Sequence, residues 1–295
     1  MGSLRAANTR LCLDFFKELS KTKRNENIFF SPLSLSAAFR MVLLGARGNT
    51  LKQIEKMGFL CSIKGTVLSC KPIKKLLFSC WKCEEAGGIH SQFQALLAAI
   101  SELSTGCSLS IANRLFGEIT YQFLQVSSYS VYFNMLELLY FNNELSMFIL
   151  LPEVVCEDFT GLEQIIPFLF SNFHFEWIIM EQLGEGVYLP QFKIEESYIL
   201  NKTLQEMGMI NVFDWGEADL LGISREDVLI VSKAIHKSYV EVNEKGTEAA
   251  GVTVIVAMPL CYPVSYEFKA DHLFLFFIRH NSTKNILLFG RYSSP

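Results

Sequence analysis

The stretch from Glu241 to Pro263 most constrains what this chain of 295 residues can fold into. It lies between two apolar blocks that read as strands, and it has no helical period. Connections in compact domains are mostly about 4–6 residues long, and longer ones tend to be functional. Its first part is small and polar, whereas Val252–Val256 is strongly β-forming. The stretch therefore predicts a long functional loop that can also adopt an extended strand.

Composition and charge exclude several classes of protein. A length of 295 residues fits one large domain or two ordinary ones, and 50% hydrophobic residues allow a sizeable core. The net charge is −4 and no basic run occurs, which argues against a nucleic-acid partner. The longest apolar run, near 145–151, is far shorter than the roughly 18 residues needed to span a membrane. The N-terminus lacks the pattern of a secretory signal, so we expect a cytoplasmic protein, with the extracellular space reachable without a signal peptide.

The eight cysteines are scattered along the chain and predict reduced thiols rather than a disulfide scaffold. A zinc-binding protein is the alternative, because four thiolates could share a metal; these are Cys61, Cys70, Cys80 and Cys83. Only Cys80-x-x-Cys83 has a typical ligand spacing, so we expect no metal and no other cofactor. The lysine-rich segment 61–88, which contains these cysteines, reads as an insertion.

Helices and strands alternate irregularly along the chain, which predicts an α+β fold. Ser31 and Pro32 read as the N-cap and first residue of an apolar helix. Helical spacing predicts helices at 8–21, 32–45, 50–57, 89–103 and 198–207. Apolar runs predict strands at 28–30, 108–115, 144–151, 187–194, 228–241, 273–278 and 286–290, with residues 232–236 also compatible with a helix.

Several long motifs, in this order, resemble the serpins, a family of serine protease inhibitors. They are SPLSLSAAFRMVLLGARGNT, ANRLFGE, ELSMFILLP, LPQFKIEESYILNKTLQEMG, SKAIHKSYVEVNEKGTEAAG and ADHLFLFFIRHNSTKNILLFGRYSSP. The chain is most similar to the ovalbumin-type intracellular branch, which includes the leukocyte elastase inhibitors. The resemblance implies a single domain over 1–295, with large mixed β-sheets, N-terminal helices and an exposed reactive-centre loop.

The resemblance implies that the opening stretch is this loop, a bait for a protease. The reactive bond then falls at Leu260–Cys261, and the hinge that inserts into a central sheet comprises Glu244, Lys245, Gly246, Thr247, Glu248, Ala249, Ala250 and Gly251. An inserted strand alternates its faces. Thr247, Ala249, Gly251, Thr253, Ile255 and Ala257 share one face, and all except Ile255 are small or lightly polar.

Leu260 before the reactive bond predicts a target with an apolar primary pocket. Chymotrypsin-like or elastase-like serine proteases have such pockets, whereas trypsin-like enzymes prefer Arg or Lys. A cysteine protease is a further target class. An enzyme is not expected, because no catalytic or nucleotide-binding motif is present.

Ser31, Ser34 and His236 match the family's shutter, a cluster beneath the central sheet. A satisfied core histidine is the simpler interpretation of His236, and the two interpretations nearly coincide.

The chain departs from the family between Gln125 and Met135, where only a short bridge stands in place of a long segment. That segment supplies a central strand and a covering helix, so the insertion slot and one edge of strand 228–241 are expected to be incomplete. We therefore expect poor inhibition. The alternative is a non-inhibitory serpin that acts as a binding protein or a protease substrate. The protein is expected to be a monomer with a risk of loop–sheet polymerisation.

Overall fold

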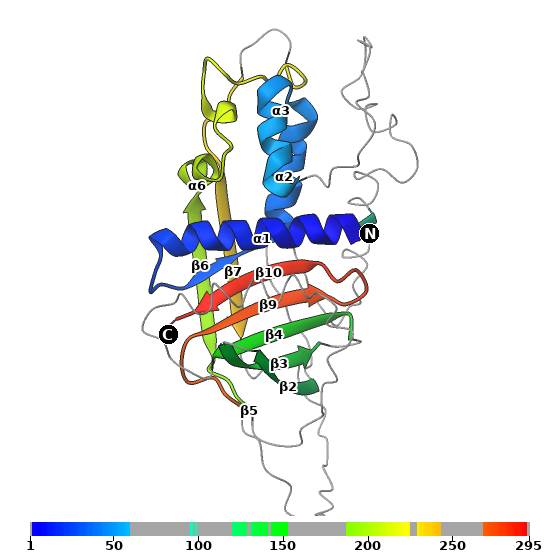
Figure 1. The fold of residues 1–295 in the computed structure, drawn as a ribbon, viewed down its shortest axis with the longest axis vertical. Helices are drawn as coiled ribbons and strands as arrows, with labels where there is room; N and C mark the ends of the chain where they lie inside the picture. Colours follow the sequence, from blue (N-terminus) through cyan, green and yellow to red (C-terminus); the bar gives the residue numbers. More distant parts are fainter. Residues whose placement is uncertain are drawn as a thin grey trace, which may run out of the picture.

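The computed structural model describes residues 2–59, 95–96, 98, 120–128, 131–140, 143–152, 187–224, 229–242 and 268–293 (Figure 1). The described helices are α1 (Gly2–Thr22), α2 (Pro32–Gly45), α3 (Gly48–Ile54) and α6 (Asn201–Glu206). A π-helical turn, η1 (Glu55–Phe59), continues α3, and a 3₁₀ turn, η5 (Asn211–Phe213), follows α6.

The largest described sheet is antiparallel and has the order β1-β10-β9-β4-β3-β2. Its strands are β1 (Ile28–Phe30), β2 (Thr120–Ser128), β3 (Val131–Leu139), β4 (Leu145–Pro152), β9 (Phe274–His280) and β10 (Ile286–Tyr292). A second, antiparallel pair joins β6 (Phe192–Ile199) to β7 (Ile235–Val242). A short parallel pair joins β5 (Val187–Tyr188) to β8 (Phe268–Lys269).

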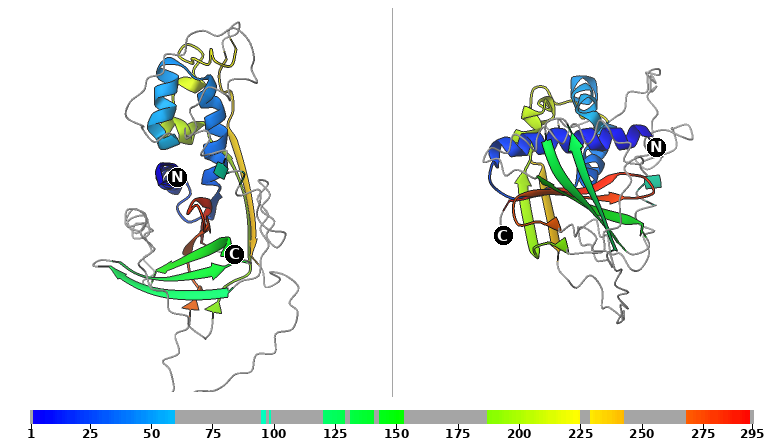
Figure 2. Two further views of the ribbon diagram at one scale, coloured as in Figure 1. Left: turned by 90° about the vertical axis from the view of Figure 1, so that its right-hand side faces the viewer. Right: turned by 60° about the horizontal axis from the view of Figure 1, so that its bottom comes forward.

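Both faces of the six-stranded sheet are covered. Phe148 and Phe277 belong to a buried cluster that also contains Phe15 of α1 on one face, whereas Phe276 packs with Phe192 of β6 on the other. Figure 2 shows β6 and β7 crossing one side of the six-stranded sheet and extending beyond it toward α2 and α3. Burial on both faces explains why β4, β9 and β10 read as continuous apolar runs rather than as alternating ones.

The structure confirms several predicted elements. Strand 28–30 matches β1, and the predicted N-cap Ser31 and the first helical residue Pro32 begin α2 as expected. The apolar strands near the C-terminus match β9 and β10.

Other expectations were wrong. Residues 198–199 belong to β6 and not to the following helix, and the run 187–194 is divided into β5 and β6 around Pro190, which has no backbone N–H to give to a ladder. Residues 232–234 are not helical, and β7 begins at Ile235. The hairpin of β2 and β3 was not predicted at all.

The predicted insertion 61–88, the strand 108–115, the hinge 244–251 and the reactive bond Leu260–Cys261 lie outside the described residues. Cys12, the one cysteine within them, is a buried free thiol. Within the same residues, no helix has the length and apolar character needed to cross a membrane.

Candidate functional site

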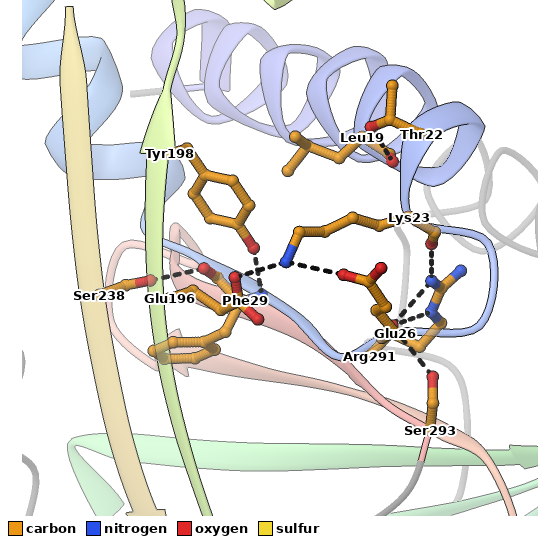
Figure 3. A network of polar contacts seen from close by, with 10 residues as sticks. All are labelled: Leu19, Thr22, Lys23, Glu26, Phe29, Glu196, Tyr198, Ser238, Arg291 and Ser293. Atoms are coloured by element: carbon orange, nitrogen blue, oxygen red, sulfur yellow. Dashed lines mark hydrogen bonds and ion pairs between the residues drawn. The ribbon is translucent and has the colours of Figure 1, made fainter.

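The outer edge of β1 is the centre of the candidate site. β1 pairs with β10 along one edge, and side chains of β6 and β7 reach the backbone of Phe29 from the other direction (Figure 3). The Phe29 N–H donates to the Tyr198 hydroxyl at 3.1 Å, and the Ser238 hydroxyl donates to the Phe29 carbonyl at 2.5 Å. Two side chains therefore satisfy backbone groups that a neighbouring strand would otherwise satisfy.

His236 makes the third contact of this kind, at the start of α2. Its Nε2 accepts a hydrogen bond of 3.0 Å from the backbone N–H of Ser31. Tyr198 and His236 are direct cross-strand partners on β6 and β7, so their side chains point to the same face as that of Ser238. The alternation of the two strands thus brings all three side chains to β1.

Ser31 joins this contact to β10. Its hydroxyl accepts from the Ser34 N–H at 3.1 Å, as an N-cap does, and donates to the Leu287 carbonyl at 2.8 Å. The ladder between β9 and β10 shifts register between Ile286 and Leu288, next to this carbonyl. One hydroxyl therefore caps α2 and fixes it to the irregular part of β10.

Burial sets the protonation state of His236. The side chain is 6% exposed, and desolvation lowers its pKa to about 4. A neutral imidazole is required for Nε2 to accept the Ser31 N–H, so burial and the hydrogen bond favour the same form. Burial also raises the pKa of Tyr198, which keeps its hydroxyl protonated.

A charged network surrounds the turn before β1 (Figure 3). Lys23 Nζ lies 2.8 Å from the Glu196 carboxylate of β6 and 3.3 Å from that of Glu26. Burial alone would lower the pKa of Lys23, but these carboxylates outweigh it and raise the pKa. The buried Arg291 of β10 donates to the carbonyls of Lys23 and Glu26. The network ties β6, β10 and the α1–β1 turn together.

Among the predicted site residues, the structure brings Ser31, Ser34 and His236 together. Ser34 contributes its backbone N–H to the cluster, while its hydroxyl makes none of the contacts described above. Sequence reasoning missed Tyr198 and Ser238. The alternation of buried and exposed residues along β6 and β7 could have indicated them, since both share a face with His236.

Comparisons with known proteins give one consistent family. The family model described as serpin (serine protease inhibitor) matches residues 6–132 and 121–295. Serpin B11 of Homo sapiens is 34% identical over 402 residues, and the leukocyte elastase inhibitor of Homo sapiens is 32% identical over 402 residues. Both comparisons cover 100% of this chain and 100% of the relative.

Solved structures agree on the fold. A crystal structure of maspin has a TM-score of 0.75 at 21% identity and covers 100% of both chains. Uncleaved ovalbumin has a TM-score of 0.68 at 26% identity and covers 99% of this chain and 100% of its own. The alignment with Serpin B11 is longer than this chain, so about 107 of its positions (402 minus 295) face no residue here.

Proposed function

This chain belongs to the serpin family, and we propose that it is a protease bait of the serpin type with its reactive bond at Leu260–Cys261. Leu260 suits the apolar primary pocket of a chymotrypsin-like or elastase-like serine protease. The human relative named leukocyte elastase inhibitor supports an elastase-like partner. The resemblance to the ovalbumin-type branch favours the cytoplasm as the site of action.

The chemistry follows from ordinary acyl transfer. The protease serine attacks the Leu260 carbonyl, the bond to Cys261 breaks, and the new amine of Cys261 leaves while Leu260 stays ester-linked to the enzyme. Insertion of the hinge as a strand beside β7 would then carry the bound protease along. Small residues on one face of that hinge, from Thr247 to Gly251, support such an insertion.

The cluster at the edge of β1 is the observation that carries this proposal. Tyr198, Ser238 and His236 attach β6 and β7 to β1 and α2, and the hinge at Glu244 begins two residues after Val242, the end of β7, in the sequence. A firmly attached β7 gives an inserting strand a fixed neighbour. We assign Ser31, Ser34 and His236 to the shutter on this basis.

A second candidate is a serpin that proteases cleave without being trapped. The two family-model matches overlap at residues 121–132, and about 107 alignment positions are missing, which supports an internal shortening near 125–135. A shortened central sheet would receive the loop poorly, so we expect weak trapping and a tendency toward loop–sheet association between molecules.

Incubation with chymotrypsin and with elastase, followed by a denaturing gel and sequencing of the new N-terminus, separates the candidates. A denaturation-resistant complex supports the trapping inhibitor. Cleavage before Cys261 without a complex supports the substrate. Absence of cleavage at Leu260–Cys261 by both enzymes would contradict both candidates.

A further inference from the structure

The short β5–β8 pair presents an aromatic and a cationic side chain to solvent. Val187 packs against a core cluster and Phe268 is buried within it, so Tyr188 and Lys269, the next residues of the two strands, point outward. The two are direct partners in the parallel pairing, and Lys269 Nζ lies 5.4 Å from the centre of the Tyr188 ring. The Tyr188 side chain is 56% exposed.

The pairing holds this surface in place. The Ala270 N–H donates to the Tyr188 carbonyl at 2.9 Å, which extends the β5–β8 ladder by one bond. Stacking of the ammonium on the ring restricts both side chains. A tyrosine that is exposed but already ordered loses little conformational freedom when a partner covers it.

Few residues separate the proposed reactive bond from this surface in the sequence. Cys261 precedes Phe268 by seven residues, so the segment between them spans at most about 25 Å when fully extended. A protease of some 240 residues is roughly 45 Å across, from the radius of gyration expected for that length. A protease that cuts at Leu260–Cys261 is therefore wider than the greatest possible distance between Cys261 and Phe268. Its body can thus extend over the β5–β8 pair while it holds the reactive bond.

We propose that Tyr188 and Lys269 form an exosite, a second contact surface for the protease that attacks the loop. This inference rests on the proposed function. Tyr188 and Lys269 would contact the rim of the protease's active-site cleft, on the side that binds the leaving group. The chemistry fits a rim that offers carboxylate or carbonyl oxygens to Lys269 and an apolar group to the Tyr188 ring. The Asp271 carboxylate, held by His272 at 2.7 Å, adds a negative charge that interacts with Lys269.

Rates of attack on the full chain test the exosite. The second-order rate constant for cleavage or complex formation at Leu260–Cys261 is measured with chymotrypsin and with elastase for the wild type, Tyr188→Ala, Lys269→Ala and Trp215→Ala. With the more reactive of the two proteases, we expect Tyr188→Ala to lower the rate about tenfold, since tyrosines are enriched among the dominant interface residues. Lys269→Ala is expected to lower the rate less and to flatten its dependence on salt.

Trp215→Ala is the matched control. It removes an aromatic side chain that is 71% exposed but lies next to η5, which packs against α3, away from the β5–β8 pair. Tyr188→Phe keeps the ring and should react nearly as the wild type does, which guards against a folding defect in Tyr188→Ala. A synthetic peptide of residues 252–267, which lacks the exosite, reports whether each protease accepts the bond itself.

Each outcome decides between the two proposals. Equal rates for the wild type and Tyr188→Ala, with cleavage at Leu260–Cys261, would overturn the exosite and leave the proposed function standing. Failure of both proteases to cut either the chain or the peptide at that bond would overturn the proposed function and the exosite with it.

Discussion

His236 on β7 accepts a hydrogen bond from the backbone N–H of Ser31, the residue that also caps α2, at a distance of 3.0 Å. One imidazole therefore connects β7, the strand that precedes the proposed hinge in the sequence, with the N-terminus of α2.

Because the acceptor must be neutral, this contact should make folding sensitive to acid. The pKa of His236 is about 4 in the fold, against about 6.5 in an unfolded chain, so the unfolded state binds more protons between those values. Stability from this group is full above about pH 6.5 and is lost as the pH falls toward 4, by about 3 kcal/mol in total. Urea unfolding of the wild type and His236→Gln at about pH 7 and pH 4.5 should show a smaller loss in the variant.

His280 provides the matched control for this titration. Burial lowers its pKa as well, and it bonds the Thr283 hydroxyl in the β9–β10 turn rather than the Ser31 backbone. His280→Gln should remove its own share of the acid sensitivity, independently of His236→Gln. An unchanged pH dependence in His236→Gln would show that His236 is not the group that titrates.

The Ser31 hydroxyl should matter more than that of Ser34. Ser31→Ala removes the cap of α2 and the donor to the Leu287 carbonyl, and should lower the free energy of unfolding by about 1–2 kcal/mol. Ser34→Ala keeps the backbone N–H that donates to Ser31, so we expect a change within about 0.5 kcal/mol. Equal losses in the two variants would contradict the geometry of the cap.

The elements that could be predicted from sequence are those whose signal is local. Ser31 and Pro32 identify the start of α2 because a cap and a fixed backbone angle act within one turn. The run from Phe274 to Ile278 is apolar at every position because both faces of β9 are covered. Ser31, Ser34 and His236 were predicted as a shutter by resemblance to a family, and the structure brings them together through hydrogen bonds at Ser31.

Signals that depend on tertiary contacts were missed. Tyr198 was predicted to begin the following helix, yet it lies in β6, where its buried hydroxyl accepts a hydrogen bond from Phe29 of β1. The β2–β3 hairpin was overlooked because the family comparison treated Gln125–Met135 as a bridge across missing residues, whereas the chain pairs these residues with one another.

Tyr198 should be the costlier of the two side chains that bond Phe29. Tyr198→Phe leaves a buried N–H without its acceptor, and we expect a loss of about 1–3 kcal/mol in urea unfolding. Ser238→Ala deprives the Phe29 carbonyl of a donor and should cost about 1 kcal/mol. Tyr239→Phe on the exposed face of β7 is the control, with an expected change within about 0.5 kcal/mol. A similar change in all three variants would argue against a special role for the β1 edge.

Gly290 on β10 should tolerate no side chain. A Cβ there would lie 2.5 Å from Phe276 Cζ and 3.0 Å from the Ile28 carbonyl oxygen, both within the packed sheet. Gly290→Ala should therefore cost about 2 kcal/mol or more through overpacking. Gly216→Ala, where the nearest atom is Asp214 Oδ1 at 3.4 Å, should be nearly neutral. Thermal unfolding of both variants and the wild type measures the two changes in stability. A neutral Gly290→Ala would mean that β10 and β9 are less tightly packed than described.

Leu260 should decide which protease attacks the loop. Leu260→Arg replaces an apolar side chain with one that pairs with the acidic primary pocket of trypsin-like enzymes. We expect cleavage at residue 260 by chymotrypsin to fall by at least about tenfold and cleavage by trypsin at the same bond to rise by a comparable factor. Val252→Arg, eight residues earlier in the same loop, introduces the same charge without changing the residue before the bond. It should leave the rate of chymotrypsin cleavage at Leu260 nearly unchanged. Fragment masses after brief digestion identify the bond that is cut, and an unchanged chymotrypsin site and rate in Leu260→Arg would rule out Leu260–Cys261 as the reactive bond.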